Sequence, residues 1–177
     1  MEILILAVVT LPLLTALFLK VANRFLNELL TNFITINAAL LSVAVSFFMF
    51  GYLLLDKFKP IKFELFEWYP SPQIIFEFYL DGLSGVMMIL ISGLSLVIQL
   101  FSTSYMSKDE KYTKYFEYFN FFVFSMLLLV LSGNFLVMFF GWELVGLSSY
   151  LLISFWYEKK SAAKAGNKAF ILNRIGD

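Results

Sequence analysis

Three ionisable residues in the last quarter of the chain have types and spacing suited to proton chemistry. Glu143 lies near the midpoint of the apolar stretch 136–157, and Arg174 and Asp177 stand three positions apart in the final basic segment. A carboxylate inside lipid costs several kcal/mol to keep charged, so it takes a partner or a proton. This arrangement indicates reversible proton binding at Glu143, with a structural ion pair as the alternative. The spacing of three places Arg174 and Asp177 on one helical face. In water such an ion pair contributes little to stability, whereas in the membrane it would be a buried pair whose protonation matters.

Other polar residues in apolar stretches are candidates for a supporting role. Gly146 and Tyr150 share the helical face of Glu143, which predicts that this face meets other helices and not lipid. Gly146 permits close approach of a helix or a water, and Tyr150 offers a hydroxyl group. Gln99 is a polar residue in an earlier apolar stretch. Its side chain is expected either to form a hydrogen bond with a neighbouring helix or to lie on a water path.

The composition indicates an integral membrane protein. Of the 177 residues 60% are hydrophobic and only 15% are charged, and the mean hydropathy is +0.83. The 13 basic and 13 acidic residues balance, so no electrostatic footprint suggests a nucleic-acid partner. The chain has no Cys and no His, which removes thiolate metal sites and histidine-ligated haem, zinc or copper. We therefore expect no cofactor in this chain.

The apolar runs predict an all-α integral membrane fold with five transmembrane helices and the start of a sixth, in one membrane domain over residues 1–177. About 20 residues cross a bilayer as a helix, and the fourth run, which is shorter, is extended into the interface by its aromatic flank 115–122. The predicted spans are roughly 3–19, 29–55, 82–101, 118–131 and 134–157, and Asp81 with Ser84 predicts an N-cap for the third. Alternation in residues 56–80 predicts a hairpin-like connection at the interface. The basic tail 158–177 leads into the sixth helix.

Basic residues concentrate in alternate connections. The connections after the first, third and fifth spans hold Lys20, Arg24, Lys108, Lys111, Lys114, Lys159, Lys160, Lys164, Lys168 and Arg174, whereas the other side holds Lys57, Lys59 and Lys62. This asymmetry predicts that the N-terminus lies on the positive-potential side of the membrane.

Glu143 is the only ionisable residue deep in any predicted span. Spans one to four contain no opposite charge to meet it. We therefore expect its cation to come from beyond residue 177 or from another chain.

Three segments carry a resemblance to a known family. They are "DGLSGVMMILISGLSLVIQLFSTSYM", "GWELVGLSSYLLI" and "KAFILNRIGD". Together they resemble the subunit 5 family of NADH dehydrogenase, the distal antiporter-like membrane subunit of respiratory complex I. The likeness runs from about Asp81 to Asp177.

The resemblance implies a role for each candidate residue. Glu143 matches the family's fifth-helix glutamate, one half of a Glu/Lys pair thought to drive proton movement. Arg174 and Asp177 match positions at the start of the sixth helix, where the acid is a candidate for a proton path. The chain would then be the N-terminal portion of an antiporter-like helix bundle. NADH, FMN, iron–sulfur clusters and ubiquinone would be bound by other subunits.

These expectations combine into a function with two alternatives. The chain is expected to be a proton-translocating, non-redox subunit of NADH:ubiquinone oxidoreductase. Its expected location is the mitochondrial inner membrane, with its N-terminus in the intermembrane space, and a bacterial plasma membrane is the alternative. Expected partners are the rest of subunit 5 on a second polypeptide, other antiporter-like and accessory subunits, and membrane lipids. The alternatives are a piece of a multi-subunit Na+/H+ antiporter and a structural anchor that has lost pumping.

Overall fold

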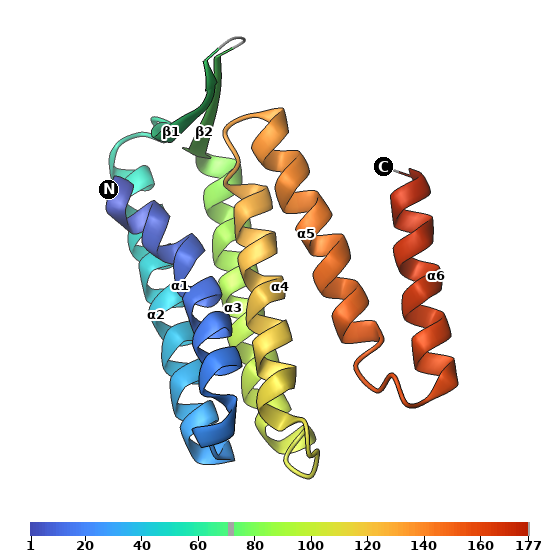
Figure 1. Cartoon of the computed structure of the whole chain (residues 1–177). Helices are drawn as coiled ribbons and strands as arrows, with labels where there is room; N and C mark the ends of the chain where they lie inside the picture. Colours follow the sequence, from blue (N-terminus) through green and yellow to red (C-terminus); the bar gives the residue numbers. More distant parts are fainter. Residues whose placement is uncertain (71–72, 177) are drawn as a thin grey trace.

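The computed structural model describes residues 1–70 and 73–176, and these form a helical bundle with one β-hairpin at an end (Figure 1). A 3-10 turn, Asn23–Phe25, joins the first two helices. The elements in chain order are α1 (Glu2–Ala22), α2 (Glu28–Leu55), β1 (Ile61–Pro70), β2 (Gln73–Leu80), α3 (Gly82–Tyr105), α4 (Tyr112–Val130), α5 (Phe135–Ile153) and α6 (Lys160–Gly176).

Four predicted spans are confirmed as helices long and apolar enough to cross a membrane, namely those of α1, α2, α3 and α5. The fourth predicted span, 118–131, lies in α4, but α4 begins earlier, at Tyr112. This earlier start adds Lys114 and Glu117 to the helix, which lowers its hydropathy. That α4 crosses the membrane stays a prediction, and so does the count of five spans with a sixth beginning.

Helices α1 to α4 form a bundle, and α5 packs on α4 while α6 packs on α5 (Figure 1). The larger apolar core lies toward the hairpin end and is contributed by α1 to α5 and the strands; its most buried members include Ile5, Met49, Leu53, Leu80, Met88 and Leu127. A smaller cluster at the other end joins Leu19, Met106, Tyr112, Phe116 and Phe155. Many hydroxyls are also buried, and several of them bond to carbonyls one turn back, as Ser46 does to Ser42.

The hairpin is bonded to the turn between α4 and α5. Its strands pair antiparallel from Ile61 opposite Leu80. Tyr79 N donates to Leu131 O at 2.8 Å and Gly133 N donates to Glu77 O at 2.9 Å. A Cβ at Gly133 would lie 3.0 Å from Glu77 O, so this approach requires glycine.

Asn134 connects the same hairpin to the start of α5. Its side-chain amide donates to Ile75 O at 2.7 Å, and its Oδ1 accepts from Val137 N at 3.0 Å. The first bond holds strand β2 and the second caps the helix. The hairpin and the first turn of α5 are therefore fixed to one another.

The predicted cap of the third span is present. Asp81 Oδ1 accepts from Ser84 N at 2.8 Å, and Asp81 N donates to Ser84 Oγ at 2.7 Å, which together form a capping box. The bond from Ser84 N is the main cause that lowers the pKa of the Asp81 carboxyl, against a smaller opposing effect of burial.

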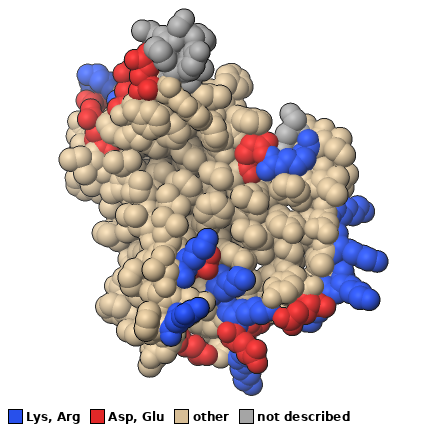
Figure 2. Space-filling view, viewed as in Figure 1, with Lys and Arg blue, Asp and Glu red and all other residues tan. Residues whose placement is uncertain are grey.

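Charged residues are distributed unevenly between the two ends. Figure 2 shows Lys and Arg gathered over the lower half of the visible face and along α6. This is the end at which α1 finishes and α4 and α6 begin. The basic connections thus meet at one end, as the alternation predicts, while the orientation in a membrane stays a prediction.

Candidate functional site

Helix α6 folds back antiparallel onto α5 along the face that carries Glu143. The rings of Tyr150 and Phe170 lie 5.4 Å apart at 54°. One helical turn toward the hairpin end, a Cβ at Gly146 would lie 3.9 Å from Asn173 Nδ2, an ordinary van der Waals contact. The prediction that the Glu143 face meets another helix is therefore confirmed, and the helix is α6.

The charged contact of this helix pair joins Glu143 and Arg174. Arg174 Nη1 is ion-paired with Glu143 Oε2, and Nη2 also donates to the main-chain oxygen of Glu143 at 3.4 Å. The guanidinium lies over the ring of Phe170, 4.9 Å from its centroid. Side-chain exposure is 32% for Arg174 and 21% for Glu143, so the pair lies at an open flank of the helix pair.

The expected source of the cation was wrong, because Arg174 of the same chain supplies it. Periodicity identifies helices but does not say which earlier helix a later one contacts. One signal was available, since the short connection 154–159 favours antiparallel neighbours. An antiparallel return brings Arg174 to the level of Glu143. Asp177 lies outside the described residues, so its predicted place beside Arg174 stays a prediction.

Gly166 is a positioning residue that the sequence reasoning missed. It is the buried residue of α6, and a Cβ there would lie 2.8 Å from Ser154 Cβ and 3.4 Å from Tyr150 Cδ2. Any larger side chain would push α6 away from α5. The signal was the run of small residues "SAAKAG", which is typical of close helix contacts in membranes.

Gln99 is not brought to this pair. It lies in α3, whose main neighbours are α2 and α4, whereas Glu143 lies in α5 between α4 and α6. Its side chain is 1% exposed, and its Oε1 has no hydrogen-bond partner among the described residues. This oxygen accepts no hydrogen bond within the described residues. The predicted hydrogen bond of Gln99 to a neighbouring helix and the water path stay predictions.

A cavity of about 280 Å³ lies between α4, α5 and α6 at the basic end. Its polar lining includes Lys111, Lys114, Tyr118, Tyr150, Ser154 and Asn167. Tyr150 lies both in this lining and on the Glu143 face, two helical turns from the acid. Along α5 the cavity therefore ends at Tyr150, about two helical turns from the ion pair.

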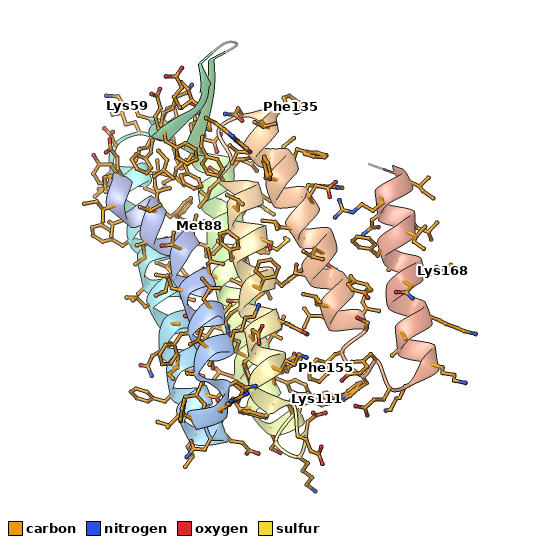
Figure 3. The ribbon with its side chains drawn as sticks, viewed as in Figure 1. Lys59, Met88, Lys111, Phe135, Phe155 and Lys168 are labelled. Carbon is orange, nitrogen blue, oxygen red and sulfur yellow. The ribbon has the colours of Figure 1, made fainter. Side chains whose placement is uncertain are left out.

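Two side-chain contacts near the surface connect the turns at the same end, and we call their four residues, Asp109, Lys111, Trp156 and Glu158, the clasp. Lys111 Nζ pairs with Glu158, and Trp156 Nε1 donates to Asp109 Oδ2 at 2.7 Å. These contacts tie the turn between α3 and α4 to the turn between α5 and α6. Figure 3 shows Lys111 and Phe155 side by side in this region, whereas Lys168 points away from α5. Hydrogen bonding to Glu158 raises the pKa of Lys111.

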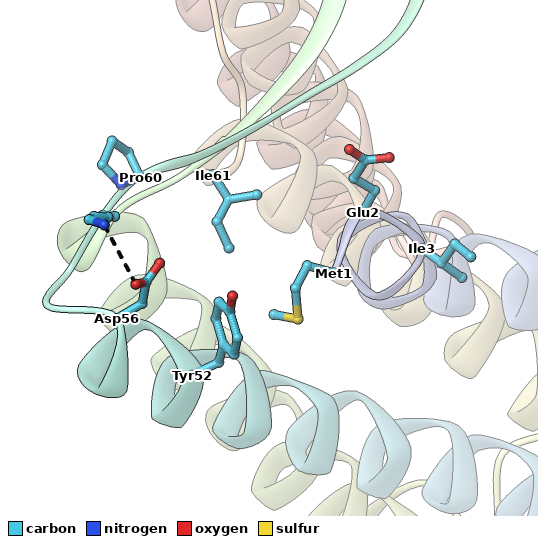
Figure 4. A pocket seen from close by; sticks show the side chains of 8 residues that line it. Met1, Glu2, Ile3, Tyr52, Asp56, Pro60 and Ile61 are labelled. Atoms are coloured by element: carbon cyan, nitrogen blue, oxygen red, sulfur yellow. Dashed lines mark ion pairs between the residues drawn. The ribbon is translucent and has the colours of Figure 1, made fainter.

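A notch at the hairpin end has no part in this site. It measures about 320 Å³ and is lined by residues that include Met1, Tyr52 and Ile61 (Figure 4). Its ion pair, Lys59 with Asp56 at 4.0 Å, is between exposed side chains. Among the residues that the structure describes, no three His, Cys, Asp or Glu side chains are grouped to hold a metal ion.

The α5–α6 arrangement suits proton binding and release. Guanidinium groups do not release a proton in proteins, so only the carboxyl of this pair can exchange one. A cation in contact favours the charged form of a carboxylate, and removal of that cation in a poorly solvated site favours the neutral form. The pair can therefore couple the separation of α5 and α6 to uptake of a proton.

Two family descriptions match segments of the chain. Residues 68–116 match "NADH-Ubiquinone oxidoreductase (complex I), chain 5 N-terminus", and residues 132–177 match "NADH:quinone oxidoreductase/Mrp antiporter, TM". The second segment contains the whole of α5 and α6.

Individual relatives agree with these descriptions. NADH-quinone oxidoreductase subunit L of Rickettsia bellii is 36% identical over 172 residues, which is 96% of this chain and 27% of the relative. NADH-ubiquinone oxidoreductase chain 5 of Rhizopus stolonifer is 36% identical over 174 residues, 97% of this chain and 26% of the relative. The chain thus spans about a quarter of the length of these relatives.

A solved structure shares the fold. It belongs to the membrane-bound sulfane sulfur reductase, an archaeal respiratory membrane complex, and superposes with a TM-score of 0.85. The superposition covers 99% of this chain and 35% of the other, at 21% sequence identity. This likeness supports the helix arrangement alone.

Proposed function

Since this chain belongs to the family of NADH-quinone oxidoreductase subunit L and NADH-ubiquinone oxidoreductase chain 5, we propose that it translocates protons in the membrane arm of complex I. The observation that carries the proposal is the ion pair of Glu143 and Arg174 between α5 and α6. In this proposal Glu143 binds and releases the proton. Arg174 is its counter-cation within the described chain.

A movement of α6 relative to α5 would drive the proton step. With the helices together, Arg174 holds Glu143 charged. When they separate, the carboxylate loses its cation and takes a proton from water, which the cavity beside Tyr150 would admit from the Lys-rich end. Gly166 fixes the contact distance and Phe170 supports the guanidinium, so both are positioning residues. The energy for the movement would come from quinone reduction elsewhere in the complex.

The same proposal places the electron carriers in other subunits. The chain has neither Cys nor His, the residues that ligate iron–sulfur clusters and most haems. Its partners would be the other membrane-arm subunits and the remaining helices of an antiporter-like module. Their supply by a second polypeptide, and the location in a mitochondrial inner membrane, stay predictions.

Replacement of Glu143 by Gln in the assembled complex tests this function. Gln keeps the shape of the side chain but has no titratable proton. We expect NADH oxidation to continue while the number of protons moved per NADH in sealed vesicles falls. Arg174→Lys should keep more of this ratio than Arg174→Ala, because a cation is retained.

Glu158→Gln is the matched control, since it removes a carboxylate of an exposed ion pair in the same chain. It should leave the ratio unchanged. An unchanged ratio in Glu143→Gln would contradict the pumping role and favour a structural anchor.

A second candidate function is cation/proton exchange without redox chemistry. The family description that covers α5 and α6 names Mrp antiporters together with quinone oxidoreductases. This candidate predicts Na+-dependent proton exchange in vesicles that receive neither NADH nor quinone. Exchange abolished by Glu143→Gln under those conditions would favour it over the redox-driven pump.

A further inference from the structure

A groove between α1 and α4 adjoins the cavity at the basic end and shares Lys114, Tyr118 and Leu151 with it. It has a volume of about 560 Å³, and Leu151 of α5 closes one side. From α1 it is lined by Leu13, Leu17 and Lys20, at the helical spacing that places residues on one face. The residues change from apolar to cationic toward the C-terminal end of α1.

Helix α4 presents a matching face to the same groove. Lys114, Glu117 and Phe121 line it with the spacing of successive helical turns. Because α4 begins at the end where α1 finishes, Lys114 lies level with Lys20, and Phe121 lies level with the apolar residues of α1. Both walls therefore have their charged part at one end and their apolar part about 10 Å deeper.

The charged end of the groove has an excess of positive charge. Lys20 and Lys114 both act electrostatically on Glu117, so the three groups are neighbours, and among the described residues neither lysine forms an ion pair with it. Two cations and one carboxylate leave a net charge of +1. Figure 2 shows several Lys and Arg side chains, with some Asp and Glu among them, at this end of the molecule, the side that would face an anionic leaflet.

The apolar end opens toward the lipid-facing surface. Leu17 is 49% exposed, and Leu14 and Phe18 beside it are 59% and 52% exposed. A small anion would use only the lysines and leave the leucine and phenylalanine walls bare. A phosphate with an attached acyl chain would fill both parts, with the rest of the chain lying on the exposed surface of α1.

We propose that this groove binds one anionic diacyl phospholipid. The phosphate lies between Lys20 and Lys114, and the upper part of an acyl chain lies between Leu13 of α1 and Phe121 of α4. Glu117 limits the affinity and disfavours headgroups with more than one negative charge. The lipid would also hold α1 against α4 and Leu151 of α5.

The experiment uses the full 177-residue chain in detergent micelles with phosphatidylglycerol and phosphatidylcholine at equal concentration. Native mass spectrometry then measures which lipid stays bound. With one net positive charge at the groove, we expect phosphatidylglycerol to be retained about fivefold more than phosphatidylcholine. Glu117→Gln should increase this preference about fivefold further, because it removes the opposing charge.

Variants separate the groove from general surface charge. Lys20→Gln combined with Lys114→Gln should abolish the preference, whereas Lys20→Arg with Lys114→Arg should retain it. The matched control is Lys164→Gln with Lys168→Gln, two exposed lysines of α6 on the same side of the molecule. Circular dichroism should show equal helix content in all of them, since none of the four lysines forms an ion pair among the described residues.

Any one of several results would overturn the proposal. They include equal retention of both lipids by the unaltered chain, undiminished phosphatidylglycerol binding in the Lys20 and Lys114 glutamine variant, and an equal loss of phosphatidylglycerol binding in the α6 control. Displacement of the lipid by millimolar inorganic phosphate would also overturn it, because it would show a simple anion site.

Discussion

The bundle of α1 to α4 and the α5–α6 pair hold together in different ways. In the bundle many side chains from every helix are buried, and the core continues into the hairpin. In the pair, α5 buries only Val137, Gly141 and Ser148 and α6 buries only Gly166 among the described residues. Stability is thus spread over many contacts in the bundle and concentrated in few contacts in the pair.

This difference suits the two regions to different tasks. A region held by many small contacts resists local opening, whereas one held by an ion pair, one ring contact and one glycine opens at low cost. The residue proposed to carry protons is in the second region. Substitutions that change its few contacts should therefore affect the position of α6 without unfolding the bundle.

The largest effect is expected from Gly141→Ala, at the boundary between the two regions. A Cβ at Gly141 would lie 2.6 Å from Leu129 Cα, which is backbone and cannot give way. The substitution should lower the free energy of unfolding by about 1–3 kcal/mol, measured by titration with SDS. Gly93→Ala, where nothing lies within 4 Å, is the control and should be neutral or stabilising. Equal effects at both sites would contradict tight packing of α5 on α4.

Gly166→Ala should have a smaller and more local effect. Its Cβ would meet Ser154 Cβ at 2.8 Å, and α6 can shift outward because its other face is exposed. We expect faster hydrogen exchange in α6, about fivefold for a loss of about 1 kcal/mol, with no change in α2 or α3. Gly176→Ala, with nothing within 4 Å, should leave exchange unaltered. Faster exchange throughout the bundle would remove the distinction between the regions.

The pH dependence of stability at Asp81 tests the bundle, the first of the two regions compared. Asp81→Ala should destabilise the protein by about 1 kcal/mol, because α3 loses its N-cap. Since hydrogen bonds from Ser84 lower the pKa of Asp81, this stabilisation is present above the ordinary aspartate pKa and is lost as pH falls through the lowered value. Asp81→Asn should keep the cap and lose this acid dependence. The check is the free energy of unfolding at a series of acidic pH values.

The smallest effect is expected at the exposed clasp, from Lys111→Gln. The pKa of Lys111 is raised by Glu158, so its contribution is present below the ordinary lysine pKa and is lost as pH rises through the raised value. An exposed pair is screened by salt, so the variant and the unaltered chain should converge at about 1 M salt. Unfolding measured at low and high salt checks this. A difference that persists in salt would show that the clasp matters more than its exposure indicates.

The helices themselves were largely predictable from the sequence. The continuous apolar runs specify α1, α2, α3 and α5 because lipid forces the backbone to bond within each segment. The start of α4 was predictable only in part. The aromatic flank from Tyr115 indicated an extension of the span, but the earlier start at Tyr112 depends on rings that pack against Phe155 and its neighbours. Local hydropathy does not report such tertiary contacts.

The site was predictable in part. The depth of Glu143 and the face shared with Gly146 and Tyr150 follow from the 3.6-residue period. The partner Arg174 and the spacer Gly166 depend on how α6 returns along α5, which is set by contacts between helices. The short connection 154–159 and the small residues that follow it, considered together, would have predicted both Arg174 as the partner and Gly166 as the contact residue.

The hydrogen bonds between the hairpin and the α4–α5 turn determine which residues of this region can change during evolution. Its bonds run mostly between main-chain atoms, which every residue except proline supplies, so most strand positions are free to change without weakening it. Gly133 and Asn134 are the exceptions, because one needs the absence of a side chain and the other bonds with its side chain on both sides. Across homologous sequences the hairpin should therefore vary in composition while these two positions stay constant.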